Sequence, residues 1–379
     1  MKILLVLDQF DGANNGNTIS ARRLAATLKN HGHEVRIAAS GESRDDKYGF
    51  GTYRVPIFDT LIKKQGFTFA RPDESKLRKA IEWADFVHFM MPFMIERKAV
   101  MLCREMGKPY TGAFHVQPEN IWFSVHLGNF KPLITLTYFV ARKYIFQYCD
   151  FIHCPSRMIA DQLRKHHYKS ELRIISNGID PDFVYHKEEK SDELKGKFVI
   201  VMSGRYSHEK RQDLLIDAVK KSKHEKEIQL FLAGQGPVEA EYRKRAEGLT
   251  NPVMMHFLTK DQLISLFGQT DLYVHASDAE IEAMSCMEAF ASGLVPIISN
   301  SDRSATPQFA LDERSLFKAG DSTDLARKID YWIEHEAERK EMEVKYAEHA
   351  KKYALDNCVL QMEEMFSDEI RKNTIEKSC

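Results

Sequence analysis

The sequence predicts an α/β protein built from two doubly wound parallel sheets, and three observations support this fold class. Short, nearly continuous apolar runs alternate with amphipathic stretches along most of the 379 residues. Such runs are typical of strands in a parallel sheet, because helices cover both faces of the sheet and bury every side chain. The pattern restarts after a charged run at residues 186–197, and the length of the chain favours two domains.

The first half opens with a strand and a helix. We expect a buried strand in "KILLVLD" (residues 2–8) and an amphipathic helix in "SARRLAATLKNHG" (20–32). Further strands are expected at residues 34–40, 84–91, 110–116, 151–156 and 172–178. Ligands of open parallel sheets bind at the carboxyl ends of the strands, so the residues that follow each strand are the informative ones.

The second half repeats this organisation. Its strands are expected at residues 197–205, 228–236, 254–258, 271–277 and 295–299. We predict a first domain at residues 1–185, a second at 186–355, and a C-terminal helix at 356–379 that crosses back to the first domain. The cleft between the two facing domains is then the default ligand site.

Charge and cysteine content exclude several classes of protein. The chain has 54 basic and 55 acidic residues and a net charge of −1, which argues against a protein that mainly wraps nucleic-acid phosphates. Its six cysteines form no C-x-x-C pair, as a zinc site would need, and fit a reducing compartment. The apolar run Ile3–Leu7 is too short for a signal peptide, and no segment approaches the ~20 apolar residues of a membrane span. We therefore expect a cytoplasmic protein.

Cations and glycines follow two strands of the second half. Gly204 permits a tight turn, and Arg205 and Lys210 stand five residues apart in a loop and at a helix start. Two cations at a helix N-terminus can bind a diphosphate. Gly234 ends the next strand, in "FLAGQGP". When either motif is taken alone, solvated cations or a ligand-free turn is the commoner explanation.

The first half carries two weaker candidates. Gly16, in "NNGNTISARRLA", allows close approach of the backbone to a ligand, although the polar residues beside it are also typical helix caps. His115, in "YTGAFHVQPEN", is expected at the end of a strand, where it can orient a substrate or share a proton. A structural role for this histidine remains the alternative.

Two glutamates follow the strand "DLYVHAS". Glu280 is expected in the loop, and Glu288 about two turns into the next helix, so both can face one ligand. A carboxylate suits a pair of ribose hydroxyls. Glu282 lies near the expected helix start, which the helix dipole favours. A partly exposed helix face is the alternative for Glu288.

These motifs, in this order, resemble a glycosyltransferase of the GT-B fold, in the large retaining family 4. The resemblance covers nearly the whole chain and is carried by "ISNGID", "GRYSHEKRQDLLIDA", "LAGQGP", "TDLYVHAS", the E-x(7)-E pair and "EAFASGLVPIIS". It implies two Rossmann-like domains that face each other across a cleft. It also implies transfer of a hexose, with retention, from a nucleotide sugar to an acceptor hydroxyl. UDP-glucose is the donor expected from base rates.

The resemblance also implies a role for each candidate. Arg205 and Lys210 would clamp the donor diphosphate, so that no metal ion and no other cofactor is required. Glu288 would hold the ribose and Glu280 the donor sugar. The remaining candidates would contact the sugar, the phosphate or the acceptor: Gly16, His115, Gly204, Gly234, Glu282, Ala283 and Met284. Many relatives have E-G-F-G after the first glutamate, and this chain has "EIEA", so the identity of the hexose cannot be carried over.

One further stretch bears on the acceptor. Residues 129–151 mix aromatic and aliphatic residues with Lys131, Arg142 and Lys143. In one interpretation, this stretch rests on an anionic membrane, at the inner face of the plasma membrane, and admits a glycolipid or diacylglycerol acceptor. In the other, it forms a buried helix of the first domain. Three alternatives stay open: a GT-B nucleotide-sugar epimerase, a polysaccharide-building enzyme with a soluble acceptor, and a non-catalytic binding subunit.

Overall fold

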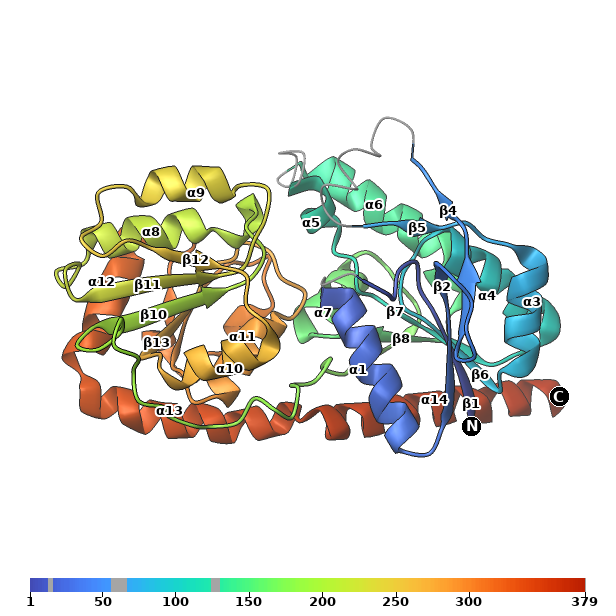
Figure 1. The fold of residues 1–379 in the computed structure, drawn as a ribbon. Helices are drawn as coiled ribbons and strands as arrows, with labels where there is room; N and C mark the ends of the chain where they lie inside the picture. Colours follow the sequence, from blue (N-terminus) through green and yellow to red (C-terminus); the bar gives the residue numbers. More distant parts are fainter. Residues whose placement is uncertain (13–15, 56–66, 124–129, 379) are drawn as a thin grey trace. The chain divides into compact units, whose positions relative to one another are not determined.

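The computed structural model describes residues 1–12, 16–55, 67–123 and 130–378. The chain divides into two compact units (Figure 1). Unit 1 comprises residues 1–121, 128–178 and 355–379, and unit 2 comprises residues 122–127 and 179–354.

Unit 1 is built on a seven-stranded sheet with the order β3-β2-β1-β6-β7-β8-β9, whose described pairings are all parallel. Its strands are β1 (Lys2–Val6), β2 (Glu34–Ser40), β3 (Lys47–Phe50), β6 (Phe86–Phe89), β7 (Tyr110–Ala113), β8 (Phe151–Cys154) and β9 (Glu171–Ile174). A small antiparallel pair is formed by β4 (Thr52–Tyr53) and β5 (Phe69–Ala70). Central strands such as β1 and β6 are almost entirely buried, as their continuous apolar sequences predict.

Helices connect these strands. Those within the described residues before Gly178 are α1 (Gly16–Asn30), α3 (Glu74–Trp83), α4 (Met94–Met106), α5 (Pro118–Phe123), α6 (Lys131–Tyr144), the 3-10 helix η1 (Phe146–Tyr148) and α7 (Arg157–Lys165). Helices such as α1 bury an apolar stripe. In α1 this stripe includes Leu24 and Leu28, which belong to the unit 1 core.

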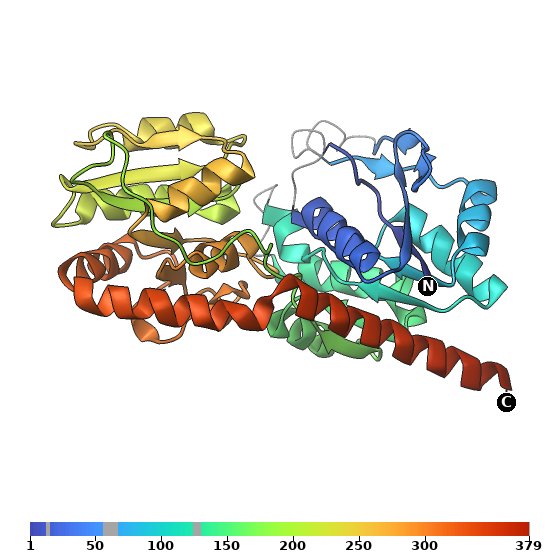
Figure 2. The same cartoon turned by 60° about the horizontal axis from the view of Figure 1, so that its bottom comes forward.

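The C-terminal helix α14 (Leu355–Ser378) belongs to unit 1, although it follows unit 2 in the chain (Figure 2). Val359, Met362 and Phe366 lie in the same core cluster as residues of β1 and β2. The ring centroid of Phe366 is 4.6 Å from that of Phe86 on β6. These apolar residues recur at helical spacing, which explains why this helix packs on the sheet.

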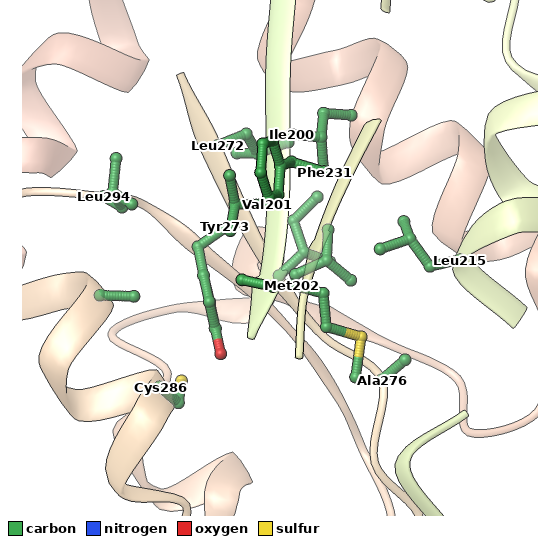
Figure 3. Packing of buried hydrophobic residues seen from close by; sticks show 14 of the residues in the cluster. Ile200, Val201, Met202, Leu215, Phe231, Leu272, Tyr273, Ala276, Cys286 and Leu294 are labelled. Carbon is green, nitrogen blue, oxygen red and sulfur yellow. The ribbon is translucent and has the colours of Figure 1, made fainter. Parts of the chain in front are cut away.

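Unit 2 is built on a six-stranded sheet with the order β12-β11-β10-β13-β14-β15, again parallel throughout its described pairings. Its strands are β10 (Phe198–Ser203), β11 (Ile228–Ala233), β12 (Met254–His256), β13 (Leu272–His275), β14 (Pro296–Ser299) and β15 (Leu316–Phe317). Its core contains side chains of β10, β11 and β13, among them Val201, Phe231 and Tyr273 (Figure 3).

The helices of unit 2 complete the alternating pattern. They are α8 (Gln212–Lys221), α9 (Glu239–Ala246), α10 (Lys260–Gly268), α11 (Met284–Ala291), α12 (Ser322–Glu334) and α13 (Glu336–Ala350), with the 3-10 helices η2 (His208–Lys210), η3 (Thr306–Phe309), η4 (Glu313–Ser315) and η5 (Lys351–Tyr353). The predicted fold class, two doubly wound parallel sheets, is therefore confirmed.

Several boundaries differ from the sequence-based expectation. Strand β7 ends at Ala113, so His115 follows the strand by two residues. Helix α11 begins at Met284, so Glu288 lies about one turn into the helix and not two. Strands β3 and β15 were not predicted, because "KYGF" and "LF" lack a long apolar run.

Candidate active site

The first element of the candidate site is the loop between β10 and α8. Gly204 adopts a φ of +150°, and Arg211, just before α8, adopts a left-handed φ of 59°. A Cβ atom at Gly234, after β11, would lie 2.0 Å from the carbonyl oxygen of Gly204. The loops after β10 and β11 therefore touch, and this contact requires glycine at position 234.

The second element is the loop between β13 and α11. The backbone N–H of Ala305 donates to the carbonyl of Glu280 at 2.9 Å, so the loop after β14 fixes the backbone of that glutamate. Asp278 ties this loop to the first one. Its N–H donates to the carbonyl of Glu209 (2.8 Å), and its carboxylate accepts from Arg211 Nη1 (3.1 Å).

These ties bring a lysine, a glutamate and a histidine together at the carboxyl edge of the sheet. Lys210 Nζ donates to Glu280 Oε1 in a short, charge-assisted hydrogen bond. His275 Nε2, on the last residue of β13, lies 3.1 Å from the same oxygen. In the part of the chain that the structure describes, neither bond uses Oε2 of Glu280.

The environment shifts the pKa values of Glu280 and His275 in this cluster. Burial by itself would raise the pKa of Glu280, but the charge of Lys210 and the hydrogen bonds from His275 and Lys210 outweigh it, so this pKa is lowered. Burial lowers the pKa of His275, against the opposite effect of Glu280. Near neutral pH the cluster therefore holds an ionised glutamate and a neutral histidine whose Nε2–H faces the carboxylate.

The other predicted residues of unit 2 lie at the same edge. Arg205 is half-buried in the loop after β10, and burial lowers the pKa of its guanidinium against the opposite effect of Glu209. Glu282 and Glu288 are buried, with 3% and 9% of their surface exposed. Ala283 takes a left-handed φ of 70° directly before α11, which begins at Met284.

The predicted residues of unit 1 are described separately. Gly16 is the first residue of α1, and the residues just before it, 13–15, lie outside the described part of the chain. His115 is buried, and its ring centroid lies 5.1 Å from that of His153 on β8. Burial, together with His153 and His88, lowers the pKa of His115 well below its usual value, so that the ring is neutral near pH 7.

The sequence-based prediction omitted three residues that shape the cluster. His275 contacts Glu280 directly, and Asp278 and Arg211 hold the two loops together. His275 carried a usable signal, because it ends an apolar strand in the way expected of His115. Asp278 and Arg211 are 67 residues apart in the chain, and nothing in their local sequences pairs them.

Two family models match adjoining parts of the chain. The model described as Glycosyltransferase Family 4 matches residues 14–183, and the model described as Glycosyl transferases group 1 matches residues 185–353. With the two parallel sheets and the charged cluster at the edge of one of them, these matches define the class. The chain belongs to glycosyltransferase family 4 and is a nucleotide-sugar-dependent glycosyltransferase of a retaining family.

Individual relatives are distant. The alpha-monoglucosyldiacylglycerol synthase of Streptococcus pneumoniae is 23% identical over 319 residues, which are 80% of this chain and 71% of that protein. A GDP-mannose-dependent alpha-mannosyltransferase of Corynebacterium glutamicum is 26% identical over 316 residues, 79% of this chain and 72% of that protein. The structure of HepE from Anabaena in complex with UDP and glucose matches 97% of this chain and 100% of its own, with a TM-score of 0.75 at 16% identity. This last match supports the GT-B fold.

Proposed function

We propose that this enzyme transfers a hexose, with retention, from a UDP-sugar to a hydroxyl of a diacylglycerol or another membrane glycolipid. UDP is favoured because HepE, which shares the fold, was solved with UDP and glucose. A lipid acceptor is favoured because the pneumococcal relative is named as a synthase of a glucosyldiacylglycerol. Glucose is our first choice of hexose for the same two reasons.

The contact between Lys210 and Glu280 carries the proposal. A lysine ammonium group has three N–H donors, and Glu280 uses one of them. The remaining donors suit the oxygens of a diphosphate at the carboxyl edge of the sheet. Together with Arg205, Lys210 would stabilise the negative charge that grows on the leaving diphosphate as the glycosidic bond breaks.

Glu280 would contact the donor sugar through its second carboxylate oxygen. Oε1 already accepts from Lys210 and His275. A sugar hydroxyl could therefore donate to Oε2. A carboxylate with a lowered pKa that is held by two donors is a weak nucleophile, so we assign Glu280 to binding and not to covalent catalysis.

The other residues would complete the donor and acceptor contacts. Glu288, a buried carboxylate on α11, would accept hydrogen bonds from the ribose hydroxyls. The backbone of Glu282, Ala283 and Met284 would approach the sugar. From unit 1, Gly16 would approach the phosphate, and His115 would contact the sugar or the acceptor.

Retention would follow from attack on the same face from which the diphosphate leaves. The acceptor hydroxyl forms the new bond to the anomeric carbon while the bond to the diphosphate breaks, and the departing phosphate oxygen takes the proton of the hydroxyl. Arg205 and Lys210 supply the positive charge for this step, so we expect no requirement for a metal ion.

The test is a panel of radiolabelled nucleotide sugars, incubated with the full chain, with and without a bacterial lipid extract. We expect nucleoside diphosphate release from UDP-glucose that depends on lipid, with the sugar label moving to the organic phase. Release that ignores lipid would indicate a soluble acceptor and overturn the lipid assignment. Conversion of the donor sugar without any acceptor would identify an epimerase instead.

A further inference from the structure

Helix α6 exposes several large apolar side chains. Ile134 and Tyr138 face the interior of unit 1, where the Tyr138 ring lies 4.1 Å from the ring of His166. On the opposite side, Leu136, Phe139 and Val140 are 54%, 47% and 52% exposed. Residues i, i+3 and i+4 share one helix face, so these three side chains form a continuous apolar stripe.

Two further exposed aromatic residues lie at the ends of the helix. Phe130, just before the helix, is 54% exposed, and Tyr144, its last residue, is 37% exposed. Single exposed apolar residues are common on soluble proteins, but contiguous apolar patches mark surfaces that bind a partner or a membrane. We call these five residues the α6 face: Phe130, Leu136, Phe139, Val140 and Tyr144.

The charged residues on helix α6 itself are all basic. Between Glu119 and Asp150 the sequence contains Lys131, Arg142 and Lys143 and no acidic residue. Arg97, from α4, lies over the ring of Tyr144 at 5.5 Å. Such an arrangement is complementary to a surface that is apolar inside and anionic outside.

We propose that the α6 face docks on the surface of a bilayer that contains anionic lipids. A helix of 14 residues is too short to cross the apolar core of a bilayer, and within the described chain no helix has the length and apolarity to do so. It can lie in the plane of the interface, with its apolar side chains among the acyl chains and the exposed Lys131 and Lys143 at the headgroups. Arg142 is held within the protein, because its Nη1 donates to the carbonyls of His166 and His167.

The role of this docking rests on the proposed function, because a lipid acceptor is found in a bilayer. Binding itself needs neither donor nor acceptor turnover. The two proposals can therefore fail independently, and the experiment below measures membrane binding without any nucleotide sugar.

The experiment is flotation of the full chain with phosphatidylcholine vesicles, made with or without phosphatidylglycerol. We expect binding to the anionic vesicles that weakens as salt is added. Replacing Phe139 and Val140 together by glutamine should lower the partition coefficient by about tenfold to a hundredfold, because two apolar side chains no longer enter the interface. Lys131→Gln with Lys143→Gln should reduce the preference for anionic vesicles.

The matched control replaces Val344 and Leu360 by glutamine. These residues, on α13 and α14, are 57% and 50% exposed, similar to the pair on α6. Equal loss of binding in both double variants, or no binding of the wild-type chain to anionic vesicles, would overturn the docking proposal. A third outcome would also overturn it: the Phe139 and Val140 double variant alters a monomer–dimer equilibrium, measured by sedimentation, and leaves vesicle binding unchanged.

A second readout separates this proposal from the proposed function. If vesicle binding fails while the enzyme still glycosylates a detergent-solubilised lipid, the docking surface is wrong and the lipid acceptor stands. If binding is observed and no lipid is ever glycosylated, the acceptor assignment is wrong and the α6 face stands.

Discussion

Lys210 is the residue on which the proposed donor site most depends. Glu280 holds its ammonium group at the carboxyl edge of the unit 2 sheet, and the carbonyl of Glu209, the residue before it, is bonded to the loop that carries Glu280. This preorganisation matters because a cation that is already positioned loses little freedom when the diphosphate binds.

Replacing Lys210 by alanine should lower kcat by about a hundredfold to a thousandfold, the range seen when one group that stabilises transition-state charge is removed. Initial rates of nucleoside diphosphate release would measure this. Lys244→Ala is the control, since that lysine is exposed on α9. Wild-type turnover in the Lys210 variant, with an unchanged thermal melt, would contradict the diphosphate clamp.

His275 offers a test through pH. Its hydrogen bond is one of the effects that keep the pKa of Glu280 low, so removing it in His275→Ala should raise that pKa. If activity needs ionised Glu280, acidification should then abolish the activity of the variant at a higher pH than that of the wild-type enzyme. The acidic limb of kcat/KM against pH should shift upward, and His275→Gln, which restores a donor, should partly reverse the shift. If His275→Ala lowers kcat/KM but leaves its acidic limb at the same pH, His275 would have a packing role and no effect on the ionisation of Glu280.

At the scale of elements, the site depends on how neighbouring loops pack. The loop after β11 lies so close to the loop after β10 that Gly234 has no room for a Cβ atom. A change at this position should therefore disturb both the stability of unit 2 and the placement of Arg205.

We expect Gly234→Ala to destabilise the protein by about 1–3 kcal/mol, the usual cost of overpacking. Donor binding should weaken in the same variant. Gly51→Ala is the control, because a Cβ atom there meets nothing within 4 Å. Urea unfolding and donor affinity would be compared for the two variants, and equal stability would show that the loop can move aside.

Helix α14 belongs to the unit 1 core, and this placement predicts a stability effect. Phe366 is fully buried, and Leu360 on the same helix is 50% exposed. Phe366→Ala should lower the free energy of unfolding of unit 1 by about 3–5 kcal/mol, and Leu360→Ala should change it by less than about 0.5 kcal/mol. Similar urea midpoints for both variants would mean that α14 is not docked as described.

At the scale of the whole molecule, the class of fold was predictable because each central strand has a continuous apolar run in its own local sequence. "KILLVLD" and "KFVIVMSGR" are apolar enough to identify buried parallel strands without tertiary information. Short edge strands such as β15 were missed because two residues carry too little pattern.

The site was harder to predict than the fold. Lys210 and Glu280 were each selected from their positions after strands, but their direct contact joins residues 70 apart and depends on the packing of two loops. Helix α6 shows the same limit. An apolar helical pattern predicts one buried face, and only the structure shows that Leu136 and Phe139 lie on the exposed side while Tyr138 is buried.

The most direct test of the central claim, that Lys210 and Arg205 bind the donor diphosphate, is calorimetric titration with UDP and with uridine. The account predicts that Lys210→Ala and Arg205→Ala each weaken UDP binding by about tenfold or more, since each removes a charged hydrogen bond. Uridine affinity should stay unchanged, because the nucleoside carries no phosphate. Equal losses for UDP and uridine, or no loss for UDP, would contradict the assignment of these two residues to the diphosphate.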